Sequence, residues 1–243
     1  MRLFSVANYK ELSWEAARFV ARRLLSKPAL TLALPTGETP LGFYQALVCL
    51  YEEGFLDFSQ ATTFNLDEFF GLPPEHPASF RTYMQEHFWS RVNLRPEACY
   101  IPSSMVEDPE EECKRYEALI AEKGGLDLVV LGLGKNGHIA FNEPGTPFES
   151  ETHLAKLLEE TRRAEARRFG SLGKVPQKAI TMGIRTIMNA REILLLVAGE
   201  EKAGILARAL QGPVTPEVPA SVLQLHPALT VIADRPALAA FEK

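Results

Sequence analysis

Short runs rich in apolar or β-branched residues alternate with amphipathic stretches along the chain. The runs, which are typical of buried strands, occupy positions 29–34, 62–65, 126–131, 193–197 and 229–233. The amphipathic stretches, which are typical of helices, occupy positions 13–25, 40–53, 79–91, 109–123 and 200–210. Strands that alternate with helices form βαβ units. The pattern therefore predicts an α/β fold with a mainly parallel, doubly wound (Rossmann-like) sheet that helices cover on both faces.

Residues that favour helix ends support these boundaries. Ser13 is a suitable N-cap for the first helix, and Pro40 suits the first turn of the second. Asp108 begins a capping box that Glu111 completes. Gly124 is expected to end that helix, because glycine readily adopts the left-handed conformation that closes a helix.

The weakest pattern lies in residues 144–176, which mix prolines and glycines with the charged run 159–168. Such a run predicts either a solvated helix or a mobile lid at about 150–176, and the periodicity does not separate the two. The chain contains no internal repeat and no low-complexity tract. We therefore expect a single domain over 1–243, long enough for a substantial core.

The composition of the chain argues against several classes of protein. A hydrophobic content of 46% and a charged content of 23% are ordinary for a soluble globular protein, and the net charge of −5 argues against a general nucleic-acid surface. Three widely spaced cysteines fit reduced thiols better than disulfides or a zinc site. The N-terminus lacks a signal-peptide pattern, and no apolar run approaches the ~20 residues that cross a bilayer. We expect a cytoplasmic protein with no membrane or nucleic-acid partner.

The most distinctive segment follows the predicted strand at 126–131. Residues 132–144 (GLGKNGHIAFNEP) place Asn136, His138 and Glu143 within eight positions. An imidazole flanked by an amide and a carboxylate is typical of a catalytic loop, although a glycine-rich turn with a packed histidine is the simpler alternative. The first six residues also match the Gly-x-Gly-x-x-Gly dinucleotide fingerprint. That fingerprint requires a helix at its third glycine, and Pro144 leaves little room for one.

Three other predicted strands also end in polar residues. The loop 35–40 (PTGETP) leads into a helix N-terminus, where backbone N–H groups and hydroxyls suit a phosphate. Asp67 and Glu68 follow a buried strand, where partial desolvation would make a carboxylate a better base. Lys202 lies in the first turn of a helix, an unfavourable position for a cation that an anionic ligand would explain. Separately, these features also fit a capped turn, surface carboxylates and an exposed lysine.

In a parallel sheet, the strand-to-helix junctions lie along one edge, where ligands bind. The four junctions together would supply a phosphate site, a base, an imidazole and a cation. The histidines, at positions 76, 87, 138, 153 and 226, lack metal-ligand spacing, and the chain contains no Gly-x-Ser-x-Gly nucleophile sequence. The sequence therefore predicts acid–base chemistry on a phosphorylated small molecule, with no metal and no cofactor.

Five segments resemble signature segments of the glucosamine-6-phosphate deaminase family. They occur in the family's order over nearly the whole chain: 34–44 (LPTGETPLGFY), 64–72 (FNLDEFFGL), 136–144 (NGHIAFNEP), 179–184 (AITMGI) and 223–227 (LQLHP). The string at 136–144 is the most specific of them. The resemblance implies conversion of glucosamine 6-phosphate and water to fructose 6-phosphate and ammonia, an aldose–ketose isomerisation coupled to deamination.

The resemblance also implies roles for individual residues. His138 would open the pyranose ring by proton transfer, with Asn136 and Glu143 orienting it. Asp67 would then remove the proton from C2 of the open-chain sugar. Some family members have Asp at the position of Asn136. Because an amide cannot hold an imidazolium as a carboxylate does, the pH profile is expected to differ from theirs.

A phosphate site follows from the same resemblance. Thr36, Gly37 and Thr39 would bind the phosphate together with Lys202. Arg168, followed by Phe169 as in the family's Arg-Phe pair, would add a second cation from the lid-like segment.

Other functions remain open from the sequence. A 6-phosphogluconolactonase would share the fold and the sugar phosphate, but its histidine loop typically lacks the Phe-Asn-Glu-Pro continuation. A sugar-sensing regulatory domain would also share the fold, but residues 1–12 are too short for a DNA-binding segment. The preferred hexosamine phosphate is not determined by the sequence.

Allosteric family members bind an N-acetylated sugar phosphate between subunits. At the corresponding stretch, 149–156 (ESETHLAK), Glu149 and Glu151 would repel a phosphate, and His153 and Lys156 are its only cations. Little chain follows the last predicted strand. We therefore expect no such activation and a monomer, with a small homo-oligomer as the alternative.

Overall fold

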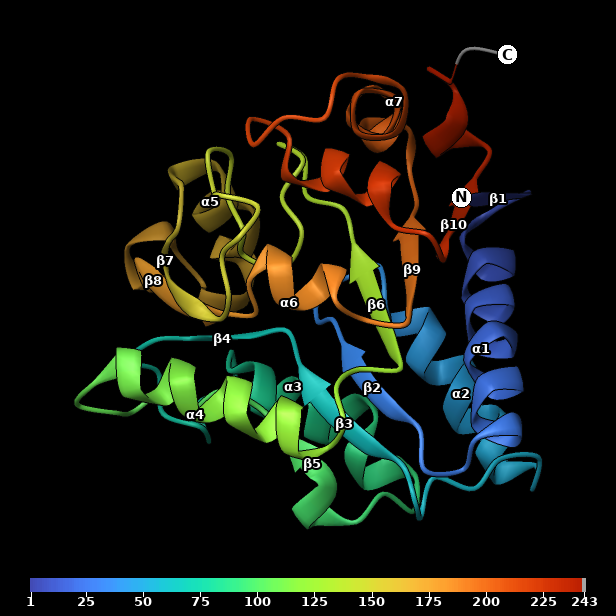
Figure 1. The fold of residues 1–243 in the computed structure, drawn as a ribbon, viewed down its shortest axis with the longest axis horizontal. Coiled ribbons are helices and arrows are strands. Elements are labelled where there is room, and N and C mark those ends of the chain that lie inside the picture. Colours follow the sequence, from blue (N-terminus) through green and yellow to red (C-terminus); the bar gives the residue numbers. More distant parts are fainter. Residues whose placement is uncertain (242–243) are drawn as a thin grey trace.

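A sheet of seven parallel strands forms the centre of the computed structural model, which describes residues 1–241 (Figure 1). Every neighbouring pair in this sheet is parallel. The strand order is β1 (Arg2–Val6), β10 (Leu229–Asp234), β9 (Glu192–Val197), β6 (Leu128–Gly132), β2 (Thr31–Leu34), β3 (Thr62–Asn65) and β5 (Cys99–Tyr100). The predicted fold class is confirmed.

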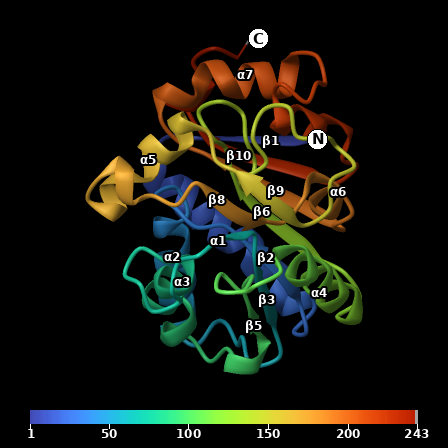
Figure 2. The same ribbon diagram turned by 90° about the vertical axis from the view of Figure 1, so that its left-hand side faces the viewer.

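Helices cover both faces of this sheet, as doubly wound folds require. One face packs against α1 (Tyr9–Ser26), α2 (Leu41–Glu52) and α3 (Phe80–His87); the other packs against α4 (Pro109–Glu122), α6 (Ile184–Met188) and α7 (Ala203–Gln211). Figure 2 shows α2 and α3 on one side of the strands and α4 and α6 on the other. Successive strand residues alternate between the two layers: in β6, Val130 joins the first core and Val129 the second.

A second, antiparallel sheet lies beside the carboxyl edge of the first, and the sequence pattern did not predict it. Its strands are β4 (Asp67–Phe69), β8 (Lys178–Thr181) and β7 (His153–Lys156), in that order. These short strands (DEF, KAIT and HLAK) mix charged with apolar residues and lack the apolar or β-branched runs of the predicted strands. From this sheet the chain continues into α5 (Glu159–Phe169), which contains the charged run. The run is thus helical, and its movement as a lid stays a prediction.

Most helix boundaries agree with the sequence, with one clear error. Asp108 caps α4 by accepting the N–H groups of Glu110 and Glu111, as predicted. The prediction of Ser13 as an N-cap is wrong, because α1 already begins at Tyr9, after Asn8. Ser13 lies inside the helix, where its hydroxyl donates to the carbonyl of Tyr9 over 2.8 Å.

Two other boundaries shift by a turn. The helix expected over 79–91 ends at His87 and is followed by a separate 3₁₀ turn, Trp89–Arg91. The helix expected from residue 200 begins as a 3₁₀ turn, Glu200–Lys202, before α7. Within residues 1–241, the helices are all too short or too polar to cross a bilayer.

Candidate active site

A cleft of about 300 Å³ opens at the carboxyl edge of the parallel sheet. It lies over the ends of β2, β3, β6 and β9, and α5 contributes to its wall. Seven of the nine predicted site residues line it: Thr36, Gly37, Thr39, Asp67, Asn136, His138 and Lys202. Glu143 and Arg168 do not line it. The structure thus brings the four strand-to-helix junctions together around one cavity.

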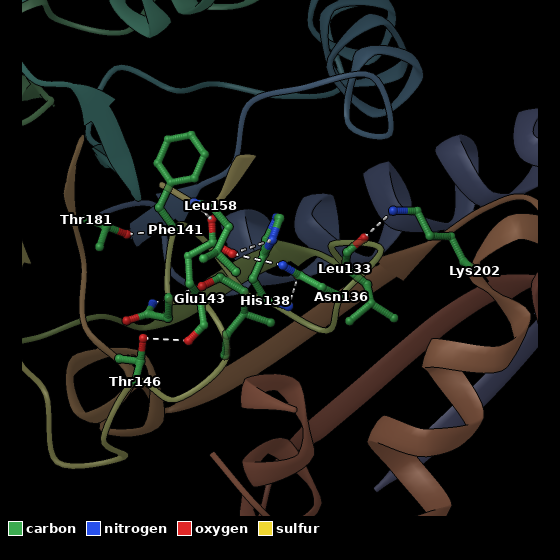
Figure 3. Close-up of polar contacts among 11 residues, drawn as sticks. Leu133, Asn136, His138, Phe141, Glu143, Thr146, Leu158, Thr181 and Lys202 are labelled. Carbon is green, nitrogen blue, oxygen red and sulfur yellow. Dashed lines mark hydrogen bonds and ion pairs between the residues drawn. The ribbon is translucent and has the colours of Figure 1, made fainter. Parts of the chain in front are cut away.

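His138 is held by two of its predicted partners. The Asn136 side chain accepts the backbone N–H of His138 over 3.1 Å, and its amide donates to Glu143 Oε2 over 2.9 Å. The same Glu143 oxygen lies 3.6 Å from His138 Nδ1, as Figure 3 shows. Glu143 therefore lies behind the imidazole, on the protein side, as a charged neighbour of Nδ1, which makes no hydrogen bond within residues 1–241.

The charge of Glu143 is strongly stabilised. Burial alone would raise its pKa, but the side chains of His138, Thr161 and Asn136 outweigh that effect and lower the pKa to about 2. Its second oxygen, Oε1, accepts the backbone N–H of Leu158 over 3.0 Å. A carboxylate that stays ionised beside Nδ1 favours a proton on that nitrogen.

The imidazole packs against a residue without a side chain. A Cβ atom on Gly134 would collide with Cδ2, Cε1 and Nε2 of His138. The backbone N–H of Gly134 also donates to the carbonyl of His138 over 2.9 Å. Gly134 is thus required by the close approach of the ring rather than by a dinucleotide.

The turn that follows His138 is held by residues that the sequence did not indicate. The Asn142 amide donates to the carbonyls of Ile139 and Met182, each over 2.9 Å. The backbone N–H of Phe141 donates to Thr181 Oγ1 of β8 over 3.0 Å. Ala140, at φ 50°, is the only non-glycine residue with a positive φ among residues 1–241, a conformation that commonly occurs at functional sites. The second sheet therefore positions this loop.

Asp67 and Glu68 lie at the start of β4 and have different environments. Glu68 accepts the backbone N–H groups of Phe69, Phe80 and Arg81, so its carboxylate caps the N-terminal end of α3. Successive residues of a strand point to opposite faces. Glu68 is therefore structural, and Asp67 faces the cleft.

Asp67 is a buried carboxyl group that makes no hydrogen bond or ion pair with residues 1–241 and is 6% exposed. Burial raises its pKa well above the usual value, and the negative charges of Glu68 and Glu165 raise it further, against the opposing effect of Arg168. A raised pKa and a free carboxylate edge suit a general base.

The predicted phosphate loop is held from outside the cleft. Tyr83 donates to the carbonyl of Gly37 over 2.8 Å. The Tyr9 hydroxyl lies 3.0 Å from the carbonyl of Thr39 and accepts the N–H of Gly42 over 2.8 Å. Gly37 has φ 112°, which favours glycine there. The hydroxyl side chains of this loop are left to line the cleft.

The two predicted phosphate cations lie in different places. Lys202 lines the cleft and donates to the carbonyl of Leu133 over 2.7 Å, and burial lowers its pKa (Figure 3). Arg168 lies on α5 behind the lining, with Nη1 3.6 Å from Glu165 Oε2 and its guanidinium 4.9 Å from the ring centre of Phe80. Contact between Arg168 and a phosphate in the cleft would require the side chain to move.

The donor set of the cleft favours organic acid–base chemistry. Across the described residues 1–241, no three His, Cys, Asp or Glu side chains are grouped so that they could hold a metal ion. The groups that line the cleft include a carboxyl, an imidazole, an amine and hydroxyls.

Comparison with known proteins identifies the family. Residues 7–231 match the family described as glucosamine-6-phosphate isomerases/6-phosphogluconolactonase. The chain belongs to this family. Among its curated relatives, a glucosamine-6-phosphate deaminase of Shouchella clausii is 47% identical over 241 residues, 99% of this chain and 98% of the relative. One of Halothermothrix orenii is 48% identical over 237 residues, 98% of each chain.

Solved structures agree with this membership. A monomeric glucosamine-6-phosphate deaminase superposes with a TM-score of 0.97 at 44% identity, covering 99% of this chain and 100% of that chain. A 6-phosphogluconolactonase from Trypanosoma brucei superposes with a TM-score of 0.80 at 18% identity, covering 99% and 98%. The latter likeness shows a shared fold alone. The resemblance found in the sequence is confirmed.

Proposed function

We propose that this protein is a glucosamine-6-phosphate deaminase, which converts glucosamine 6-phosphate and water to fructose 6-phosphate and ammonia. The observation that carries the proposal is Asp67, a buried carboxyl group with no protein partner, in the same cleft as an oriented imidazole. The names of relatives that are 47–48% identical over nearly the full length support it.

His138 acts first, at ring opening. Glu143 stays ionised and lies beside Nδ1, so the opposite ring nitrogen, Nε2, is the one that exchanges a proton with the sugar. Transfer of a proton from the anomeric hydroxyl to the ring oxygen breaks the ring C–O bond and leaves the C1 aldehyde. Asn136 fixes the loop on which the imidazole lies.

Asp67 acts next, at C2. A proton α to an aldehyde is acidic because the electron pair moves toward the carbonyl oxygen, so a carboxylate in contact can remove it. The product is an enolamine-type intermediate. Protonation at C1 and transfer of a proton from the nitrogen to O1 then give a C1 hydroxymethyl group and an imine at C2. Addition of water to that imine, followed by loss of ammonia, leaves the C2 ketone.

Thr36, Gly37 and Thr39 bind the phosphate at the N-terminal end of α2, with Lys202 as the cation from the opposite wall. Arg168 would join them only after leaving Glu165.

A lactonase would need no base at C2, and this difference separates the two functions of the family. In the test, purified protein is supplied with glucosamine, galactosamine or N-acetylglucosamine 6-phosphate, and ammonia and ketose phosphate are measured. We expect ammonia from glucosamine 6-phosphate with chelator present. Hydrolysis of 6-phosphogluconolactone without ammonia release from any hexosamine phosphate would overturn the proposal.

The same proposal includes a monomeric, cytoplasmic enzyme without nucleic-acid partners. It is supported by the likeness to a relative described as monomeric, 44% identical, and by the net charge of −5. Near the start of β7, Glu149 would repel an activating phosphate, whereas Arg185, 3.4 Å from Glu151, offsets the charge of that second acid.

A further inference from the structure

Helix α5 places a further carboxylate in the cleft. Glu165 lines the cavity with Asp67 and His138. Its side chain is 21% exposed, and its Oε2 atom is buried without a hydrogen bond to any residue of 1–241. The reaction proposed above gives this residue no role. Oε2 faces Arg168, and Oε1 makes no hydrogen bond or ion pair within residues 1–241, so the carboxylate has hydrogen-bonding capacity left for a ligand in the cleft.

Glu165 is held in place by its own helix. Arg168, one turn further along α5, lies with Nη1 3.6 Å from Glu165 Oε2. The guanidinium is itself held over the rings of Phe80 and Tyr83, at 4.9 and 5.4 Å from their centres. Arg168 thus fixes Glu165 on the cleft side of the helix.

The charges around Asp67 do not balance within the protein. The negative charge of Glu165 is close enough to act on Asp67, and Arg168 acts on it in the opposite sense. Both carboxylate oxygens of Glu68 accept hydrogen bonds from backbone N–H groups at the start of α3. With the three acids ionised, Asp67, Glu68, Glu165 and Arg168 carry a net charge of −2, which a ligand cation would partly neutralise.

The amino group of a hexosamine is such a cation. An amine on a carbon next to an oxygen-bearing carbon resembles the α-amino group, whose pKa is about 8, so the amine is largely protonated at pH 7. If Asp67 is the base at C2, a substituent on C2 lies beside it. Hydrogen bonds between an ammonium and carboxylates are markedly stronger than those of a neutral hydroxyl.

We infer that Glu165 is a specificity-determining residue, which with Asp67 receives the C2 ammonium of the amino sugar phosphate and selects it over analogues with a neutral group at C2. The inference rests on the proposed function, because that function places C2 beside Asp67. A hydroxyl group gains no charge pairing there, and an acetamido group has neither the charge nor the size of an ammonium.

Calorimetric binding of two acyclic inhibitors tests this. 2-Amino-2-deoxyglucitol 6-phosphate and glucitol 6-phosphate differ only in the amine or hydroxyl at C2, and neither turns over. In Glu165→Gln, we expect Kd for the amine to rise about 10-fold, which is ~1.4 kcal/mol, and Kd for the hydroxyl compound to change less than about threefold. Glu165→Asp keeps the charge and should recover part of the loss.

Glu160→Gln is the matched control. Glu160 is an exposed acid that lines the same cleft from the same helix, so the same substitution there should leave the ratio of the two Kd values unchanged. Equal weakening of both inhibitors in Glu165→Gln would mean a structural role and would overturn the inference, as would an unchanged ratio. Ammonia release by the parent protein is measured separately and tests the proposed deaminase activity. The ratio of the two Kd values tests the role of Glu165, so one claim can fail while the other holds.

Discussion

Replacement of Asp67 by Asn tests the base at C2 most directly. Asparagine has nearly the same shape, and the side-chain carboxyl group of Asp67 makes no hydrogen bond or ion pair with residues 1–241, so the change removes proton-accepting capacity without removing a side-chain hydrogen bond. General-base catalysis contributes typically about 100- to 10,000-fold, or ~2.7–5.4 kcal/mol at 1.36 kcal/mol per tenfold. We expect kcat to fall by that factor, and KM to rise about tenfold at most, because Asp67 is also one of the two carboxylates inferred to receive the substrate ammonium.

The same substitution should leave the thermal stability of the protein unchanged or raise it, although it lowers kcat. Because the folded state raises the pKa of Asp67 above its unfolded value, the folded state binds a proton more tightly, and stability from this group is lost as pH rises through the folded pKa. Above the ordinary pKa of an aspartate, the buried carboxyl group therefore costs stability, and Asn removes that cost. Thermal unfolding at pH 7 should show Asp67→Asn to be at least as stable as the parent, with the difference shrinking toward pH 4.

Glu68→Gln provides the matched control, since the two acids are neighbours in β4. It replaces one of the oxygens that accept the N–H groups at the start of α3, so it should destabilise the protein by about 1–3 kcal/mol and leave kcat within a few-fold. The assay is coupled ammonia release with saturating glucosamine 6-phosphate, alongside calorimetric unfolding. A kcat for Asp67→Asn within tenfold of the parent, in correctly folded protein, would refute the role of Asp67.

Three further predictions follow from the histidine loop and from the assembly. Because the pKa of Glu143 is lowered to about 2, its ionised side chain stabilises the folded protein above pH ~4.5, and this stabilisation is lost as pH falls through ~2. Glu143→Gln should therefore lower the free energy of unfolding by up to about 3 kcal/mol at pH 7. Denaturant unfolding should show that the difference from the parent protein disappears in acid. Gly134→Ala should lower kcat about 100-fold, because the new Cβ displaces the His138 ring; crystallography of the variant would show whether the ring has moved. Light scattering should give a monomer, and rate curves should be hyperbolic and insensitive to N-acetylglucosamine 6-phosphate; a hexamer or sigmoidal kinetics would contradict this.

Local sequence patterns predicted five of the seven strands of the parallel sheet and the helices α1, α2, α3, α4 and α7, but not β1, β5 or α6. Buried strands such as β6 and amphipathic helices such as α4 repeat their apolar positions at the period of their own backbone, so no distant contact is needed to recognise them. The same logic located Asp67, His138 and Lys202. Each follows a strand at the edge where parallel strands all end, and the structure places all three around one cleft.

Pairing between segments that are distant in the sequence determines the second sheet and the orientation of its side chains. β4, β7 and β8 come from three separate parts of the chain, and their few residues become strands only because they pair with one another. That pairing turns Asp67 toward the cleft and Glu68 toward α3, a distinction that two adjacent acids do not show in sequence. It also leads into α5, which places Glu165 opposite the strand ends. No strand of the parallel sheet leads into that helix, so only tertiary packing could have located Glu165 at the site.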